Sequence, residues 1–344
     1  MRLQNICLGA ALAMAAPLHA AVPSQAQEKP VELKLAHWLP AGHPQQKSME
    51  EWGESLNKAS GGTITFKVFP AQQLGKAFDH YDMARDGIAD VTYVNAGFQP
   101  GRFPIMGAGE LPLLIKNAKG GSRAFDEWYR KYAAAEMKDV KFCVGYLLDP
   151  GSFHAKARKI TMPEDVKGMK IRPANATMGN MVTELGGTNV QGAAPEVRDL
   201  LEKGVIEAVT FPWGSLTLFG IDKVTKYHMD VPLYVTTLSW VMNKDKYNGM
   251  SDRQKKAVDD HCNNEWAERI AIPQADFENG GHAKIGALGD HEVYSLNADQ
   301  VAAWRKATAP LETKWADAVK KTGGDPKAIL DSLKSSLAKF DAAF

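Results

Sequence analysis

The chain has 344 residues, of which 44% are hydrophobic and 24% are charged, and its formal net charge is +1. This length and apolar content suffice for a large buried core, and they suit one two-lobed protein or two domains. The near-neutral charge gives no reason to expect a nucleic acid or an acidic surface as a partner, so neither is predicted.

The N-terminal region predicts an export signal. Arg2 provides the positive start, residues 6–18 form an apolar run, and the small-residue cleavage signal is LHA at 18–20 or SQA at 24–26. The apolar run is shorter than the roughly twenty residues that a membrane anchor needs. We therefore expect a cleaved signal peptide at residues 1–26 and a mature protein in the periplasm, and no later segment is long and apolar enough to span a membrane.

The first part of the chain predicts a parallel α/β unit. Nearly continuous apolar strands are expected at 31–36, 63–69 and 89–94, with helices at 44–59 and 78–85 between them. His37 and Trp38 follow the first strand, and Asn95 follows the third. A further helix at 121–137 and a strand at 140–148 lead to the turn Asp149-Pro150-Gly151, where we expect the chain to cross into a second lobe.

Residues 163–215 predict a second unit of the same kind. A short strand at 169–172 ends with Arg172, helices follow from Asn175 or Thr177 and from Pro195, and a strand at 205–210 leads to Phe211 and Trp213. Ligands of open α/β sheets bind beyond the carboxyl ends of the strands. We therefore expect the guanidinium and the two aromatic rings to face one cleft, where arginine can hold a carboxylate through two parallel N–H···O bonds.

The C-terminal part predicts a return strand and helices. The β-rich segment 234–242 is expected to carry the chain back into the first lobe, and a long helix begins at Ser251, reaches about 270 and continues past Pro273 with a kink. Two amphipathic helices are expected at 298–321 and 326–340.

Two cysteines, Cys143 and Cys262, remain after signal cleavage. An oxidising compartment allows them to pair. One lies among strand-like residues and the other on a helix, so we favour two buried free thiols.

Several motifs in a fixed order carry a family resemblance. The block P-x-D-x-K-G-x-K-I-R-P follows ELKLAHWLPAGHPQQK, TFKVFPAQQLGKAFD, ARDGIADVTYVN and PGRFPIMGAGELPLL, so that the match runs from about Glu32 to Asn243. This order resembles the DctP-type solute-binding subunits of TRAP (tripartite ATP-independent periplasmic) transporters. The resemblance implies a two-lobed α/β periplasmic binding protein fold with a ligand cleft between the lobes. Lobe I would comprise 27–149 plus 238–278, and lobe II would comprise 150–237 plus 279–344.

The resemblance also implies a set of ligand-binding residues. Arg172 matches the family's carboxylate-binding arginine, while Phe211 stands where sialic-acid-binding relatives have asparagine, which favours a ligand with an aromatic or apolar body. The remaining candidates at cleft-facing positions are Trp38, His37, Asn95, Lys76 and Trp213. Phe153 and His154 lie near the place where some relatives have a second arginine. The competing interpretations are core packing for the rings, solvation for the lysine and a surface ion pair for the arginine.

No catalytic signature is present in the chain. Motifs such as His-x-x-Glu-His, Cys-x-x-Cys, Gly-x-Ser-x-Gly and the P-loop are missing, so we expect neither enzymatic activity nor a cofactor or metal. The sequence thus predicts a monomeric receptor that captures a small organic acid for TRAP permease subunits. The alternatives are a binding protein of an ATP-driven importer, against which the block Lys170–Pro173 argues, and a periplasmic hydrolase.

Overall fold

The computed structural model describes residues 28–344, so the predicted signal peptide lies outside the described part of the chain. The first of two sheets has the strand order β2-β1-β3-β10-β4. β1 pairs in parallel with β2 and β3, whereas β10 is antiparallel to both of its neighbours, β3 and β4. The strands of this sheet are β1 Val31–Ala36, β2 Ile64–Phe69, β3 Val91–Asn95, β4 Val140–Leu147 and β10 Thr237–Asn243.

The second sheet has the order β11-β9-β5-β8-β6-β7. β6 is parallel to β7 and β8, while β5 is antiparallel to β8 and β9. Its strands are β5 Ser152–Ala155, β6 Lys170–Arg172, β7 Thr188–Asn189, β8 Ala208–Phe211, β9 Tyr227–Asp230 and β11 Glu292–Ser295. Each lobe contains one sheet with helices packed around it, which is the α/β fold class that the sequence predicts. As expected, β10 carries the chain back into the first sheet.

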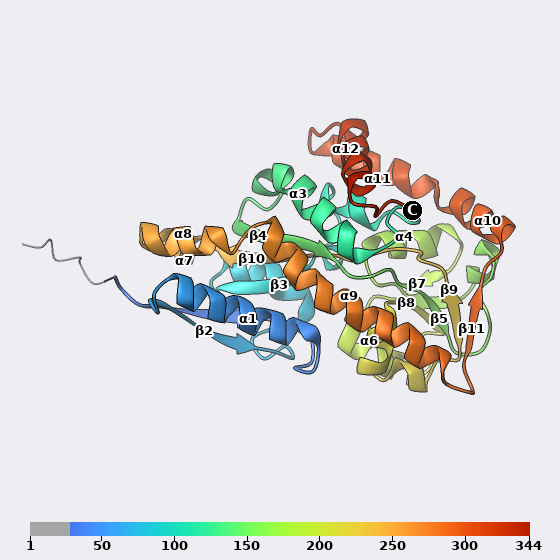
Figure 1. Ribbon diagram of the computed structural model, residues 1–344. Coiled ribbons are helices and arrows are strands. Elements are labelled where there is room, and N and C mark those ends of the chain that lie inside the picture. Colours follow the sequence, from blue (N-terminus) through green and yellow to red (C-terminus); the bar gives the residue numbers. More distant parts are fainter. Residues whose placement is uncertain (1–27) are drawn as a thin grey trace, which may run out of the picture.

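Helices cover both sheets. They are α1 Pro44–Ala59, α2 His80–Arg85, α3 Ala118–Glu136, α4 Ala176–Glu184, α5 Val197–Glu202, α6 Trp213–Leu218, α7 Lys244–Asn248, α8 Asp252–Asp260, α9 Asn264–Gly286, α10 Ala298–Thr308, α11 Pro310–Lys321 and α12 Pro326–Lys339. α9 is the longest of these, and in Figure 1 it runs from beside the first sheet to α6 and β11 of the second. Short 3-10 segments include η1 Ala77–Asp79, η2 Ala96–Phe98 and η3 Met106–Glu110.

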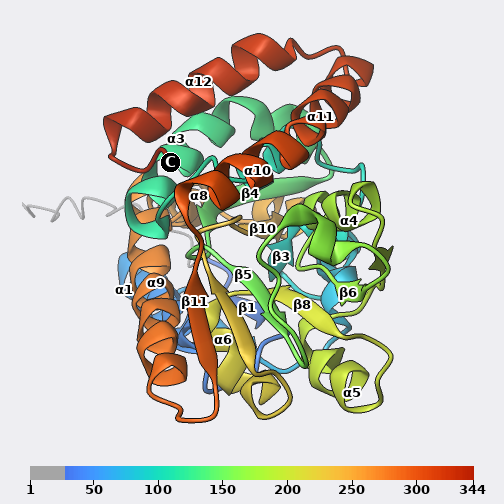
Figure 2. The same ribbon diagram turned by 90° about the vertical axis from the view of Figure 1, so that its right-hand side faces the viewer.

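The C-terminal helices, which the sequence analysis groups with the second lobe, contact both lobes. α12 lies along α3 (Figure 2), and the Trp128 indole on α3 donates to the Ile329 carbonyl at 3.1 Å. On the other side, the Trp304 indole on α10 donates to the carbonyl of Thr161, at 3.1 Å. The helices therefore link the lobes along one side of the molecule.

Two long helices of the sequence analysis are each interrupted. The helix expected from Ser251 to about residue 270 is α8 and α9, because Asn263 leaves the helical conformation and its side chain accepts the Trp266 N–H at 3.0 Å. α9 then continues through Pro273, as expected. The helix expected at 298–321 is α10 and α11, with Pro310 at the start of the second.

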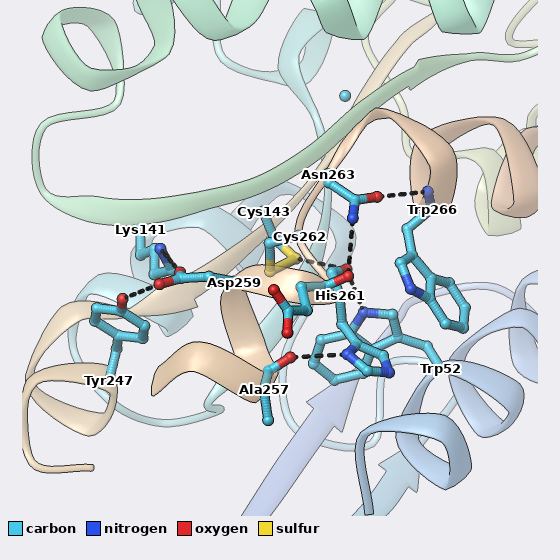
Figure 3. Close-up of a disulfide and its surroundings, with 12 residues drawn as sticks. Trp52, Lys141, Cys143, Tyr247, Ala257, Asp259, His261, Cys262, Asn263 and Trp266 are labelled. Atoms are coloured by element: carbon cyan, nitrogen blue, oxygen red, sulfur yellow. Dashed lines mark hydrogen bonds and ion pairs between the residues drawn. A yellow bond between two sulfur atoms is a disulfide. The ribbon is translucent and has the colours of Figure 1, made fainter. Parts of the chain in front are cut away.

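The break between α8 and α9 brings the two cysteines together. Cys143 on β4 and Cys262 form a disulfide with a Cα–Cα distance of 4.3 Å (Figure 3). The prediction of free thiols was therefore wrong: Cys262 lies in the short connection between the helices, beside β4, and not in the middle of a helix. The Trp52 indole donates to the neighbouring His261 carbonyl at 2.8 Å and so fixes this connection on α1.

Candidate ligand-binding site

A narrow cavity lies between the two sheets. Both sheets contribute walls, and the lining residues are Trp38, Leu39, His43, Tyr93, Asn95, Phe98, Leu148, Arg172, Ala174, Ala194, Phe211, Pro212, Ser215, Phe219, Thr236 and Leu238.

Strand ends supply the central lining residues. Trp38 lies just beyond β1 and Asn95 ends β3, two strands that pair in parallel. Arg172 ends β6 and Phe211 ends β8, again a parallel pair. The carboxyl ends of parallel strands in both lobes therefore meet at the cavity, as expected for a ligand site of an open α/β sheet.

Arg172 is a buried cation without a protein counter-ion. Its side chain is 2% exposed, its Nε donates to the Gly192 carbonyl at 2.8 Å, and within residues 28–344 it forms no ion pair with a carboxylate. Burial lowers the pKa of Arg172 to about 10, and Tyr234 and Glu196 partly oppose this shift. The side chain stays charged at neutral pH, so an anion in the cavity would supply the missing partner.

Aromatic rings form the apolar walls. The Phe211 ring lies 5.5 Å from the guanidinium carbon of Arg172 and packs edge-on against Phe219 at 5.9 Å. On the opposite wall Trp38 packs on Tyr93 and Phe98, with ring centres 5.2 and 5.6 Å apart. A cation beside apolar walls suits a small carboxylate with an apolar or aromatic body.

Four of the nine candidate residues line this cavity together, and five do not. The four are Arg172, Phe211, Trp38 and Asn95. The residues outside its lining are His37, Lys76, Phe153, His154 and Trp213.

His154 and Trp213 lie behind the Phe211 wall. His154 Nε2 is 3.0 Å from the Phe211 carbonyl oxygen, and His154 Nδ1 is 2.9 Å from Nδ1 of His228. The Trp213 ring packs edge-on against the His154 ring at 4.9 Å. Burial holds the pKa of His154 well below its usual range, so this imidazole is neutral and supports the wall.

The other three candidates occupy different surroundings. His37 is buried with its Nε2 2.8 Å from Gln46 Oε1. Phe153 packs on Trp304 at 5.5 Å. Lys76 is exposed at the start of η1.

Several lining residues were not predicted from the sequence, because helix packing, and not a strand end, brings them to the cavity. His43 is one: its Nδ1 accepts the Gln45 N–H at 3.0 Å and so caps α1. Burial lowers the pKa of His43 to about 3. The capping pattern of His43 before Pro44 was the available signal, but it predicts a helix start and not a ligand contact.

A buried carboxyl group bridges the lobes next to the site. Glu110 of η3 is 2% exposed and accepts the Thr237 hydroxyl at 2.9 Å and the Thr177 hydroxyl of α4 at 3.2 Å. Burial raises its pKa to about 7, against these hydrogen bonds. Glu110 also lines a second, larger cavity, in which Lys314 is the cation. The smaller cavity is the candidate ligand site because, of the two, it contains the buried, unpaired Arg172.

Two close contacts hold α6, and with it the Phe211 wall, against α9. Ser215 donates from its backbone N–H and its hydroxyl to the carboxyl group of Glu278, at 3.0 and 2.6 Å. Gly281 packs so tightly that a Cβ atom there would lie 2.2 Å from the Gly214 Cα. α9 therefore positions one wall of the cavity.

Two other kinds of feature are absent from the described residues. No group of three or more His, Cys, Asp or Glu side chains between 28 and 344 has an arrangement that could hold a metal ion. No helix in the same range has the length and apolar character for a membrane span.

Comparisons with known proteins give one consistent family. The model described as "Bacterial extracellular solute-binding protein, family 7" matches residues 35–318. A TRAP solute-binding protein from Rhodoferax ferrireducens T118, solved with copurified benzoate, is 27% identical, with a TM-score of 0.84 and coverage of 90% of this chain and 98% of that chain. A periplasmic TRAP protein from Bordetella bronchiseptica with bound (R)- and (S)-mandelate is 28% identical, with a TM-score of 0.85 and coverage of 91% and 100%.

Two further relatives show the range of the similarity. A marine metagenome TRAP protein described as specific for aromatic acid ligands, solved with 3-hydroxybenzoate, is 30% identical, with a TM-score of 0.84 and coverage of 91% and 99%. The match to a curated solute-binding protein of Albidiferax ferrireducens is 22% identical and covers 56% of this chain and 59% of that protein's length.

Proposed function

The chain belongs to the bacterial extracellular solute-binding proteins of family 7, and on that premise we propose that it captures a small aromatic monocarboxylate for uptake by a TRAP permease. Its structural relatives are TRAP solute-binding proteins. The observation that carries the choice of ligand is Arg172, a buried cation that has no carboxylate partner among residues 28–344 and faces aromatic walls.

The ligand class follows from the single cation and the aromatic walls of the cavity. One buried arginine neutralises one carboxylate, and the walls beside it are the rings of Phe211, Phe219, Trp38 and Phe98. A dicarboxylate would bury a second negative charge although Arg172 is the only cation in the lining, and a sugar acid would place several hydroxyl groups against those rings. The relatives solved with benzoate, 3-hydroxybenzoate and mandelate support an aromatic acid.

The proposed location, lobe division and protein partner rest on the family. We propose a periplasmic, monomeric receptor with lobe I at 27–149 plus 238–278 and lobe II at 150–237 plus 279–344, which close on the ligand. TRAP membrane subunits would be its protein partner, and it would carry out no reaction on the ligand. The ATP-driven importer and the hydrolase are not favoured, because the family and the structural relatives are TRAP binding proteins.

The test is a binding titration by calorimetry with benzoate and mandelate, using the mature protein and Arg172→Met. Losing one partner of a buried ion pair costs about 3–5 kcal/mol, which is a loss of affinity of roughly a hundred- to several-thousand-fold. A matched control is Arg198→Met, which removes an arginine that pairs with Glu202 on the surface of α5 and should leave affinity unchanged. Binding of sugar acids or dicarboxylates alone would refute the ligand class, and binding of no acid would refute the receptor role.

A further inference from the structure

The polar side chains of the cavity are mainly hydrogen-bond donors. Besides Arg172, Trp38 is 5% exposed and its indole N–H is buried without an acceptor among the described residues. The Tyr93 hydroxyl, which can donate or accept, is likewise buried without a partner among these residues. A buried donor without an acceptor destabilises a fold, and native proteins nearly always supply one. Because Trp38 lines the cavity, a bound ligand is the natural source of that acceptor.

Asn95 provides a second donor beside Trp38. Its Oδ1 accepts the Gly97 N–H at 2.9 Å, which leaves the amino group as the free end of the amide. Within residues 28–344 the Asn95 amino group makes no hydrogen bond. Ala36 of β1 pairs with Thr92 of β3, so Trp38 and Asn95, two and three residues further along parallel strands, lie at the same edge of the first sheet.

The rest of the lining offers no carboxylate. The hydroxyl proton of Ser215 is directed to Glu278, and His43 accepts a backbone N–H at Nδ1, so its neutral ring carries its proton on Nε2. No aspartate or glutamate lines the cavity. A ligand ammonium group would therefore be buried beside an arginine, with neutral hydroxyl groups but no anion to pair with it.

We infer that the ligand carries, besides the carboxylate bound by Arg172, a second hydrogen-bond-accepting oxygen that Trp38 and Asn95 bind, and that it carries no ammonium group. The class is a hydroxy- or keto-substituted aromatic monocarboxylate, and the inference rests on the proposed function. Arg172 belongs to the second sheet and the two donors to the first, so such a ligand bridges the lobes at its two polar ends.

Calorimetry on the mature protein at pH 7 tests the class with acids that share one skeleton: phenylacetate, mandelate, 3-hydroxyphenylacetate and phenylglycine. A neutral hydrogen bond to a buried donor corresponds to roughly a three- to tenfold gain in affinity. We expect at least one oxygenated acid to bind about tenfold more tightly than phenylacetate. Phenylglycine, whose ammonium would be unpaired, should bind at least about a hundredfold more weakly than mandelate.

Two variants test the residues through the ratio of affinities for the oxygenated acid and phenylacetate. Trp38→Phe keeps a ring but removes the N–H, and Asn95→Ser keeps an oxygen for the Gly97 N–H but removes the amino group. Each should reduce the ratio about three- to tenfold. The matched control is Trp304→Phe, which removes an indole N–H that is bonded to Thr161 outside the cavity and should leave the ratio unchanged.

The outcomes separate this inference from the proposed function. Equal affinity for phenylacetate and both oxygenated acids, all lost in Arg172→Met, would overturn the inference and leave the proposed function intact. Tight binding of phenylglycine would also overturn it. A ratio that survives in both variants would overturn the assignment to Trp38 and Asn95, and a variant that fails to fold leaves the ligand series on the wild-type protein as the deciding measurement.

Discussion

Glu110 gives a prediction in which the stability of the protein depends on pH. Burial raises its pKa from the ordinary 4.5 to about 7 in the folded protein. Between these values the folded chain holds a proton that the unfolded chain has released. The stability linked to Glu110 is therefore fully present below about pH 4.5 and is lost as pH rises through about 7. A difference of about 2.5 pH units corresponds to about 3 kcal/mol.

The substitution Glu110→Gln removes the titration and keeps a side chain that can bond to Thr237 and Thr177. Urea unfolding at pH 5, 6, 7 and 8 gives the free energy of unfolding at each pH. Between pH 5 and 8 the wild-type value should fall by about 2.5 kcal/mol more than that of Glu110→Gln. Glu278, whose pKa burial also raises to about 7, will keep part of the slope in both proteins.

A control variant, Glu54→Gln, changes an exposed glutamate of α1 and should retain the wild-type slope. If Glu110→Gln and the wild-type protein show the same slope between pH 5 and 8, the reasoning is refuted. The Glu110 carboxyl would then have to be solvated or paired in the folded protein in a way that its burial does not suggest.

Two further predictions concern the covalent link and the α6–α9 contact. Replacing Cys143 and Cys262 by alanine opens a 119-residue loop and should lower the free energy of unfolding by about 2–5 kcal/mol in urea, whereas an unchanged value or a thiol that reacts in the folded wild-type protein would contradict the link. Gly281→Ala should cost about 1–3 kcal/mol and weaken ligand binding, because its Cβ would meet the backbone of Gly214. Its neighbour Gly280 has no atom within 4 Å of a Cβ, so Gly280→Ala should be neutral or slightly stabilising, and equal effects of the two would disprove the contact argument.

The sequence predicted those helices and strands whose ends are set by neighbouring residues, such as a helix cap or a turn. β1 and α1 have the predicted bounds, because an apolar run ends in a capped turn before Pro44. β7 and β11 were not predicted: β7 has two residues, and β11 has no fully buried position, so neither leaves an apolar pattern in the sequence. The disulfide was missed for a related reason, since it depends on a break of three residues between two helices.

The same limit applies to the site. Strand ends indicated Arg172, Phe211 and Asn95, which line one cavity. Trp213 was grouped with Phe211 because only one residue separates them, but it begins α6 and its ring turns toward His154. Phe219, at the other end of that helix, lines the cavity in its place, and its position depends on how α6 packs on α9.

The place of β10 between β3 and β4 has a consequence for the order of folding. The first sheet lacks its connecting strand until residues 237–243 have been made, and all but one strand of the second sheet precede them in the chain. β3 and β4 do not pair with each other, so the N-terminal half cannot complete its sheet alone. The first sheet therefore becomes complete only when a strand from the last third of the chain joins it, and this long-range dependence predicts slow folding.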